Sequence, residues 1–234
     1  MTHDRPFEAP DLIEVMEEAV NYNRFLKDLL AEWAGPLGTV LDFGAGNGRF
    51  ALHLQSLGAR VAALEPDPGL RARIARAGIA VYEDLGAVEG ESMDGVYSIN
   101  VLEHIEDDLS VLRSMWRVLR PGGRLLLYVP AFQILYSAND RRVGHVRRYR
   151  RHELVDRLAD ASFRVVRAEY VDTVGFAAGL WYRLFGSRDG WLAPSAVRLY
   201  DRVAFPVSRY LDSLLQGAIG KNLLVLGERS ETSG

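Results

Sequence analysis

Three glycines, Gly44, Gly46 and Gly48, follow an aliphatic run and precede a segment with helical hydrophobic spacing. Such a turn lets backbone N–H groups approach a ligand at a helix N-terminus. The dinucleotide fingerprint G-x-G-x-x-G would place its third glycine at position 49, which is Arg49 here. Asp42, two residues before the first glycine, would repel a pyrophosphate and attract an ammonium group. The spacing favours a ligand with an amino-acid group over NAD or FAD, while a tight strand-to-helix connection remains the alternative explanation.

Acidic residues also follow the next two predicted strands. Glu65 comes directly after the run 60–64, where a carboxylate can accept hydrogen bonds from both hydroxyls of a ribose. Asp84 and Leu85 follow the run 79–82, where an adenine edge would lie. Glu83 is an alternative to Asp84, which would otherwise be a solvated loop acid. Together with the glycine turn, these residues predict a site for an adenosine that carries an amino acid.

The elements that must position these residues alternate along the chain. Short aliphatic runs and helical patterns alternate between residues 39 and 129, which predicts βαβ units and a parallel sheet. The expected strands are 39–43, 60–64, 79–82, 95–99 and 124–129, and the expected helices are 48–57, 67–76 and 106–119. Pro121-Gly122-Gly123 is expected to end the last helix. A helix over 10–33 precedes this block, and a polar loop (130–151), helix 152–161, strand 163–170, an aromatic-rich helical segment (173–216) and strand 222–227 follow it.

Several motifs resemble those of class I S-adenosylmethionine-dependent methyltransferases in order and spacing: Asp42–Gly48, Glu65, Asp84-Leu85, Asn100–Ile105 and Leu119–Gly123. The resemblance implies an α/β fold with a Rossmann-like, seven-stranded, mostly parallel sheet and an antiparallel last strand. It also implies S-adenosylmethionine as the cofactor. The residues implied to bind it are Asp42, Gly44, Ala45, Gly46, Gly48, Glu65, Pro66, Asp84, Leu85, Asn100 and Val101.

Residues outside this core supply the other expected site groups. The segments 21–24 and 136–149 resemble a bacterial subgroup of these enzymes. Tyr22, on the N-terminal helix, either closes over the cofactor or packs as an ordinary helix residue. His145 is the candidate base or acceptor-orienting group, with His104 second and Tyr149 third. The alternative for His104 is a purely structural role. Glu103 can be explained as a carboxylate at the start of the next helix.

An arginine-dense segment lies between residues 141 and 151. We expect Arg141, Arg147 and Arg148 to hold an anionic group of the acceptor. The alternative is a solvated loop whose arginines pair with acidic helices. The chain as a whole is expected to form one α/β domain with additions: a helical cap (1–38), the cofactor-binding core (39–172), a helical insertion serving as acceptor lid (173–220), and a final strand and tail (221–234).

Composition limits the chemistry. The 234-residue chain has no cysteine, which excludes disulfides, thiolate metal sites and cysteine nucleophiles. Its net charge of −3 and isoelectric point near 6.0 argue against a dedicated nucleic-acid binder. We expect no metal, because no carboxylate triad is visible, and a cytoplasmic protein without a signal or transmembrane segment. A homodimer is left open.

The leading hypothesis is a methyltransferase acting on oxygen of a small molecule with an anionic group. An RNA methyltransferase that uses the arginine-rich loop is one alternative. A cyclase-like protein that binds S-adenosylmethionine without transferring its methyl group is the other.

Overall fold

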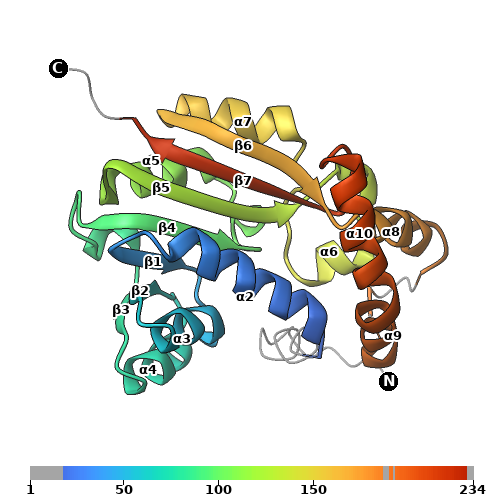
Figure 1. The fold of residues 1–234 in the computed structure, drawn as a ribbon, viewed down its shortest axis with the longest axis horizontal. Helices are drawn as coiled ribbons and strands as arrows, with labels where there is room; N and C mark the ends of the chain where they lie inside the picture. Colours follow the sequence, from blue (N-terminus) through green and yellow to red (C-terminus); the bar gives the residue numbers. More distant parts are fainter. Residues whose placement is uncertain (1–17, 187–189, 192, 231–234) are drawn as a thin grey trace.

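A seven-stranded sheet with the order β3-β2-β1-β4-β5-β7-β6 forms the centre of the molecule (Figure 1). The strands β1 to β5 pair in parallel, and β7 lies antiparallel between β5 and β6. The predicted Rossmann-like sheet with an antiparallel last strand is confirmed. The strands are β1 Thr39–Phe43, β2 Arg60–Leu64, β3 Ala80–Tyr82, β4 Met93–Ile99, β5 Leu119–Pro130, β6 Phe163–Val171 and β7 Asn222–Arg229.

The computed structural model describes residues 18–186, 190–191 and 193–230. The cap residues 1–17, which include the start of the helix expected over 10–33, and the tail 231–234 lie outside the described residues. The helices are α2 Val20–Ala34, α3 Arg49–Ser56, α4 Pro68–Arg76, α5 Asp108–Val118, α6 Ala138–Arg142, α7 Arg151–Asp160, α8 Thr173–Phe185, α9 Pro194–Leu199 and α10 Phe205–Leu215. Shorter turns are η1 Leu85–Ala87, η2 Leu102–His104, η3 Gln133–Leu135 and a π-helical turn, η4 Tyr200–Ala204.

Successive side chains of β5 point to opposite faces of the sheet and join a different apolar cluster on each face. Leu125, Leu127 and Val129 join the apolar cluster that includes α5 and α7. Leu126 and Tyr128 join the cluster beneath α2 and α3. Burial on both faces explains why this strand reads as a continuous apolar run.

The helical insertion between β6 and β7 stands beyond the carboxyl ends of β4 and β5 (Figure 1). Open α/β sheets bind ligands at that edge. The insertion consists of α8, α9, η4 and α10, in agreement with the helical pattern expected over 173–216. Within the described part of the chain, no helix is long and apolar enough to cross a membrane.

Several element boundaries differ from the sequence prediction, most of them by one or two residues. The helix expected over 106–119 is α5, which starts at Asp108 because Asp107 caps it by accepting a hydrogen bond from Ser110 N at 3.1 Å. The strand expected over 124–129 already begins at Leu119, which pairs with Met93 ahead of a register shift. The loop expected over 130–151 contains η3 and the short helix α6.

Candidate active site

The glycine-rich turn connects β1 to α3. Gly44, Gly46 and Gly48 have φ angles of 78°, 56° and 80°, which residues with a Cβ adopt only with strain. A Cβ on Gly44 would lie 2.5 Å from Val101 Cγ2, and one on Gly48 would lie 2.9 Å from Ile74 Cγ1. Both backbone conformation and close packing therefore require these glycines, so the turn by itself does not prove a ligand.

Glu65 follows β2 and faces the same turn. Its Oε2 accepts a hydrogen bond from Gly46 N at 2.7 Å, and its Oε1 accepts one from Asp67 N at 3.0 Å. The residue is only 8% exposed. The carboxylate predicted to bind a ribose is thus fixed beside the glycine turn by backbone donors at both oxygens.

Asp42 lies in β1 beneath the turn and is 2% exposed. Burial raises the pKa of Asp42 to about 7, and the neighbouring Tyr97 hydroxyl and Ala51 amide offset only part of this rise. Its Oδ2 has no hydrogen-bond partner among the described residues. Because an unsatisfied buried carboxyl oxygen is costly, this atom points to a missing donor.

Arg71 on α4 ties the turn region to the end of β3. Its Nη1 donates to the carbonyl of Pro66 at 2.6 Å, and its Nη2 pairs with Glu83 at 3.2 Å. The amide of Ala45 donates to the Leu64 carbonyl at 3.0 Å and connects the turn to β2. Glu83, the alternative to Asp84, is therefore engaged by an arginine that the sequence analysis did not identify.

Asp84 and Leu85 lie at the end of β3, at the carboxyl edge of the sheet. The Oδ1 of Asp84 accepts a hydrogen bond from Ala87 N at 3.0 Å and caps η1. Leu85 is buried, and its carbonyl accepts a hydrogen bond from Arg117 Nη2 at 2.5 Å. The turn η1 thus fixes both residues that were predicted to meet an adenine.

Tyr22 reaches the end of β4 from α2. Its hydroxyl accepts a hydrogen bond from Asn100 Nδ2 at 3.4 Å, and burial raises the pKa of Tyr22 to about 12. Its ring packs edge-on against Tyr128 and Phe205, with centroid distances of 6.2 and 5.6 Å. The structure therefore brings Tyr22 to the predicted cofactor segment at Asn100, as a packed residue of α2.

A carboxylate of the helical insertion holds the start of α2. Asp201 on η4 accepts hydrogen bonds from the amides of Asn21 and Tyr22, both at 2.8 Å. It is 4% exposed. A negative group at a helix N-terminus is stabilising. The insertion therefore positions Tyr22, a link that no local sequence pattern indicated.

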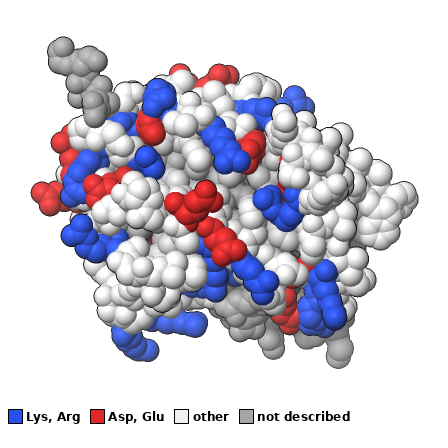
Figure 2. Space-filling model, viewed as in Figure 1, with Lys and Arg blue, Asp and Glu red and all other residues white. Residues whose placement is uncertain are grey.

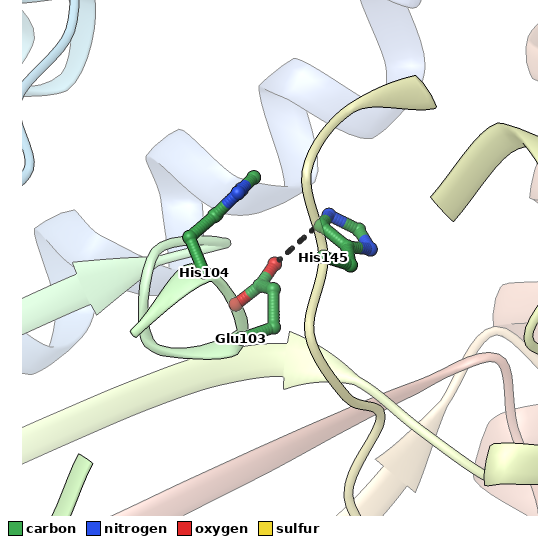
Figure 3. A group of neighbouring side chains, drawn as sticks. All are labelled: Glu103, His104 and His145. Carbon is green, nitrogen blue, oxygen red and sulfur yellow. Dashed lines mark ion pairs between the residues drawn. The ribbon is translucent and has the colours of Figure 1, made fainter. Parts of the chain in front are cut away.

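Glu103, His104 and His145 converge at the carboxyl end of β4 (Figure 3). The two imidazole rings pack edge to face, with centroids 4.7 Å apart. His145 Nδ1 lies 2.8 Å from Asp140 Oδ1, and His145 Nε2 lies 3.6 Å from Glu103 Oε1. Burial raises the pKa of Glu103 to about 8. Desolvation and the neighbouring His145 lower the pKa of His104.

Asp140 anchors the loop that carries His145. Burial alone would raise the pKa of Asp140, but hydrogen bonds from His145 and Arg148 hold it well below its usual value. Arg148 Nε donates to Asp140 Oδ1 at 2.7 Å, and Ser137 N donates to Oδ2 at 2.9 Å. The spacing Ser137-x-x-Asp140, a capping box, was the available sequence signal for this anchor.

Asp108 at the start of α5 collects three donors. Its Oδ2 accepts hydrogen bonds from Arg147 Nη1 at 2.7 Å and Tyr149 Oη at 2.8 Å, and its Oδ1 accepts one from Arg157 Nη1 at 2.6 Å. Tyr149 is 1% exposed. The contacts of Arg147, Arg148 and Tyr149 favour the alternative of a salt-bridged loop. Arg141 is exposed, and no ion-pair partner for it exists in the described ranges.

Basic and acidic side chains are interspersed on the face shown in Figure 2. A groove of about 450 Å³ lies between α2, α10 and strands β6 and β7, away from the glycine turn. Apolar side chains are exposed on the insertion: Trp181, Leu184, Phe185, Trp191, Leu199, Val203, Val207, Tyr210, Leu214 and Leu215.

A family model described as a methyltransferase domain matches residues 16–168, which include β1 to β5, the glycine turn and the cluster around His145. The chain belongs to this methyltransferase family. The resemblance to class I S-adenosylmethionine-dependent methyltransferases is thereby confirmed, together with S-adenosylmethionine as the cofactor of the family.

Known proteins add a sequence match over part of the chain and a fold match over most of it. The chain is 35% identical over 99 residues to a ubiquinone biosynthesis O-methyltransferase of Xanthomonas axonopodis pv. citri, covering 38% of this chain and 41% of that protein. The matched region therefore spans less than half of that relative. An S-adenosylmethionine-dependent methyltransferase from Archaeoglobus fulgidus superposes with a TM-score of 0.58 at 14% identity, covering 88% of this chain and 93% of the other.

A second structure, Haemonchus contortus phosphoethanolamine N-methyltransferase 2 in complex with S-adenosyl-L-methionine, has a TM-score of 0.61 at 16% identity. It covers 88% of this chain and 52% of that protein. At these identities the structures establish the fold and not the acceptor.

Proposed function

We propose that this methyltransferase transfers the methyl group of S-adenosylmethionine to an oxygen atom of a small molecule that carries an anionic group. The observation that carries the proposal is the pair of buried carboxylates at the glycine turn: Glu65 is fixed at the turn, and Asp42 has an unsatisfied oxygen. The O-methyltransferase name of the matched Xanthomonas protein supports oxygen as the acceptor atom.

The residues at the turn fit the cofactor chemically. When bound, S-adenosylmethionine supplies a methyl group already activated on a sulfonium. Asp42 is suited to its ammonium group, because that group would give the buried Oδ2 a charged donor. Glu65 can accept the ribose hydroxyls without losing its backbone contacts, since each carboxylate oxygen accepts two hydrogen bonds. Asp84 and Leu85, which η1 holds at the end of β3, are the proposed contacts for the adenine.

The acceptor side is built from the loop after β5. A hydroxyl acceptor has to lose a proton, and His145 is the proposed base or orienting group. Asp140, 2.8 Å from Nδ1, fixes the imidazole and leaves Nε2 directed toward Glu103. Arg141 is the proposed contact for the anionic group, because Arg147 and Arg148 are engaged by Asp108 and Asp140.

Replacing Glu65 by alanine is expected to weaken S-adenosylmethionine binding by more than tenfold, which is about 1.4 kcal/mol. The variant removes the ribose acceptor and frees the amide of Gly46. Isothermal titration calorimetry measures the change. Asp160→Ala is the control, because Asp160 is an exposed carboxylate at the end of α7 that belongs to no candidate site. Equal losses in both variants, or none in Glu65→Ala, would contradict the proposed cofactor site.

The acceptor class is tested by release of S-adenosylhomocysteine. Purified protein with cofactor is incubated with hydroxy acids or with phenols that carry a carboxylate. Parallel reactions use the uncharged methyl esters of the same compounds. Turnover that depends on the anionic group and decreases in Arg141→Ala supports the proposal. Turnover only with RNA, decreasing steeply with salt, would assign the arginine-rich segment to phosphate contacts instead.

A further inference from the structure

Glu103 is a fully buried carboxyl group whose one charged neighbour within ion-pair distance, among the described residues, is His145 at 3.6 Å. Its side chain is 0% exposed. Neither Oε1 nor Oε2 has a hydrogen-bond partner among the residues that the structure describes. Since native proteins seldom leave both oxygens of a buried carboxyl unpaired, the arrangement indicates a missing cation or donor.

Two histidines supply nitrogen atoms beside this carboxyl. One ligand atom from each of Glu103, His104 and His145 lies within 4.8 Å of the other two (Figure 3). The separation of His145 Nε2 and Glu103 Oε1 is 3.6 Å. Ligand bonds of about 2.0–2.1 Å in a tetrahedral zinc site place neighbouring ligand atoms roughly 3.3–3.4 Å apart. The observed pair is thus close to coordination distance, whereas His104, whose Nδ1 lies 3.3 Å from the Gly144 carbonyl, has to move closer for all three atoms to bind one ion.

The residues behind His145 match the surroundings of a metal-binding histidine. Its Nδ1 lies 2.8 Å from Asp140 Oδ1, so the proton on this nitrogen is held by a carboxylate and Nε2 is left as the donor atom. Asp140 is itself fixed by Arg148 and by the Ser137 amide. A carboxylate–histidine–metal arrangement of this kind orients the ring and raises its basicity.

We infer that Glu103, His104 and His145 bind one divalent first-row metal ion, with zinc as the ion that best suits two imidazoles and one carboxylate. Three protein ligands leave a fourth position for water or a substrate oxygen. The sequence predicts no metal, because no carboxylate triad is visible and His145 lies 41 residues beyond His104.

The position of this site suggests what the open position would take. Glu103 and His104 lie on η2, directly after Val101, which packs against Gly44 of the cofactor turn. An oxygen ligand of the metal would therefore lie beside the cofactor turn. The ligand class is a hydroxyl oxygen of the acceptor, whose proton a bound metal would make easier to remove. With Nδ1 at Asp140 and Nε2 on the metal, His145 would then act as the orienting group and not as the base. This use of the metal rests on the proposed function, whereas metal binding does not.

The test is zinc binding by the full chain after removal of any affinity tag and treatment with a chelator. Isothermal titration calorimetry with Zn²⁺ alone is expected to give one site per chain. Co²⁺ in its place is expected to give visible absorption bands of a low-coordinate nitrogen and oxygen site. Glu103→Gln, His104→Ala and His145→Ala are each expected to weaken zinc binding by at least tenfold.

Surface histidines provide matched controls, because exposed imidazoles also bind zinc. His152→Ala on α7 and His53→Ala on α3 are expected to retain wild-type affinity. Glu103→Gln keeps the shape of the side chain and removes its charge, so it tests the site even if a histidine variant folds poorly. Zn²⁺ is expected to raise the Tm of the wild type but not that of Glu103→Gln.

Two results would overturn the inference: no saturable zinc binding by the wild type, or equal losses in the cluster variants and the surface controls. The outcomes also separate this inference from the proposed function. Cofactor binding without zinc binding removes only the metal site, while zinc binding without cofactor binding removes the proposed function and leaves the metal site in place.

Discussion

Asp108→Ala is expected to lower the free energy of unfolding by about 2–3 kcal/mol. The carboxylate is 1% exposed and accepts hydrogen bonds from Arg147, Arg157 and the buried hydroxyl of Tyr149. Its removal takes the charged acceptor from two partly exposed guanidinium groups and from the buried Tyr149 hydroxyl, although Arg147 keeps the Glu106 carbonyl and Tyr149 keeps the Leu102 carbonyl at 3.3 Å. Urea denaturation followed by circular dichroism measures the loss.

Two smaller changes at the same contacts are the controls. Tyr149→Phe removes one hydrogen bond and is expected to cost about 1 kcal/mol. Arg147→Ala removes a partly exposed partner while Asp108 keeps Arg157, so a loss of about 1 kcal/mol is again expected. If Asp108→Ala costs no more than either control, the three donors do not depend on this carboxylate.

Asp42→Asn is expected to stabilise the cofactor-free protein at pH 8 and to weaken its binding of S-adenosylmethionine. Burial raises the pKa of Asp42 from 3.8 to about 7, a difference that corresponds to about 4 kcal/mol as an upper limit. The folded protein therefore holds a proton between pH 4 and 7 that the unfolded chain has released. The resulting cost to stability grows as the pH rises through this range and is complete above pH 7.

The neutral amide removes this cost, so the stability difference between Asp42→Asn and the wild type should be small at pH 4 and largest at pH 8. Cofactor affinity should change in the opposite direction, with a loss of about tenfold or more, because an amide carries no charge for the ammonium group. Wild-type affinity should itself rise between pH 6 and 8 as Asp42 ionises. Urea denaturation and calorimetry at several pH values check both effects, and a pH-independent stability difference would contradict the assignment.

The sheet, and the positions of the proposed cofactor residues at its carboxyl edge, could be predicted from the sequence because their signals are local. Each strand is a short apolar run, and Glu65 and Asp84 stand immediately after such runs. The carboxyl ends of neighbouring parallel strands lie at one edge of the sheet, so residues that directly follow such strands in the sequence are expected to lie near one another in the fold. The glycine turn is a further local signal, since its positive φ angles require glycine.

The contacts of the acceptor side could not be predicted in the same way. Asp108 meets Arg147, Tyr149 and Arg157 from 39, 41 and 49 residues away. The sequence shows the arginines between residues 141 and 151 but not which of them already have partners. Arg147 and Arg148 therefore looked equivalent to Arg141, although burial of Asp108 and Asp140 distinguishes them.

The three proposed metal ligands could not be predicted from local sequence patterns either. Glu103 and His104 occupy a tight turn after β4, and the anchor that orients His145 is Asp140 on α6. No periodicity relates these positions, so only the folded chain brings them together. The hydrogen bond from the Tyr22 amide to Asp201 joins residues that are 179 positions apart, so no local pattern predicts it either.

The place of β7 between β5 and β6 also sets an order of assembly during synthesis. The strand β6 leaves the ribosome before β7, yet its only paired neighbour in the described sheet is β7. Asp201, which receives the first amides of α2, emerges late as well. The glycine turn can thus form on a nascent chain before β6 has its neighbour and before Asp201 reaches the start of α2, so the sheet is completed only with its last strand.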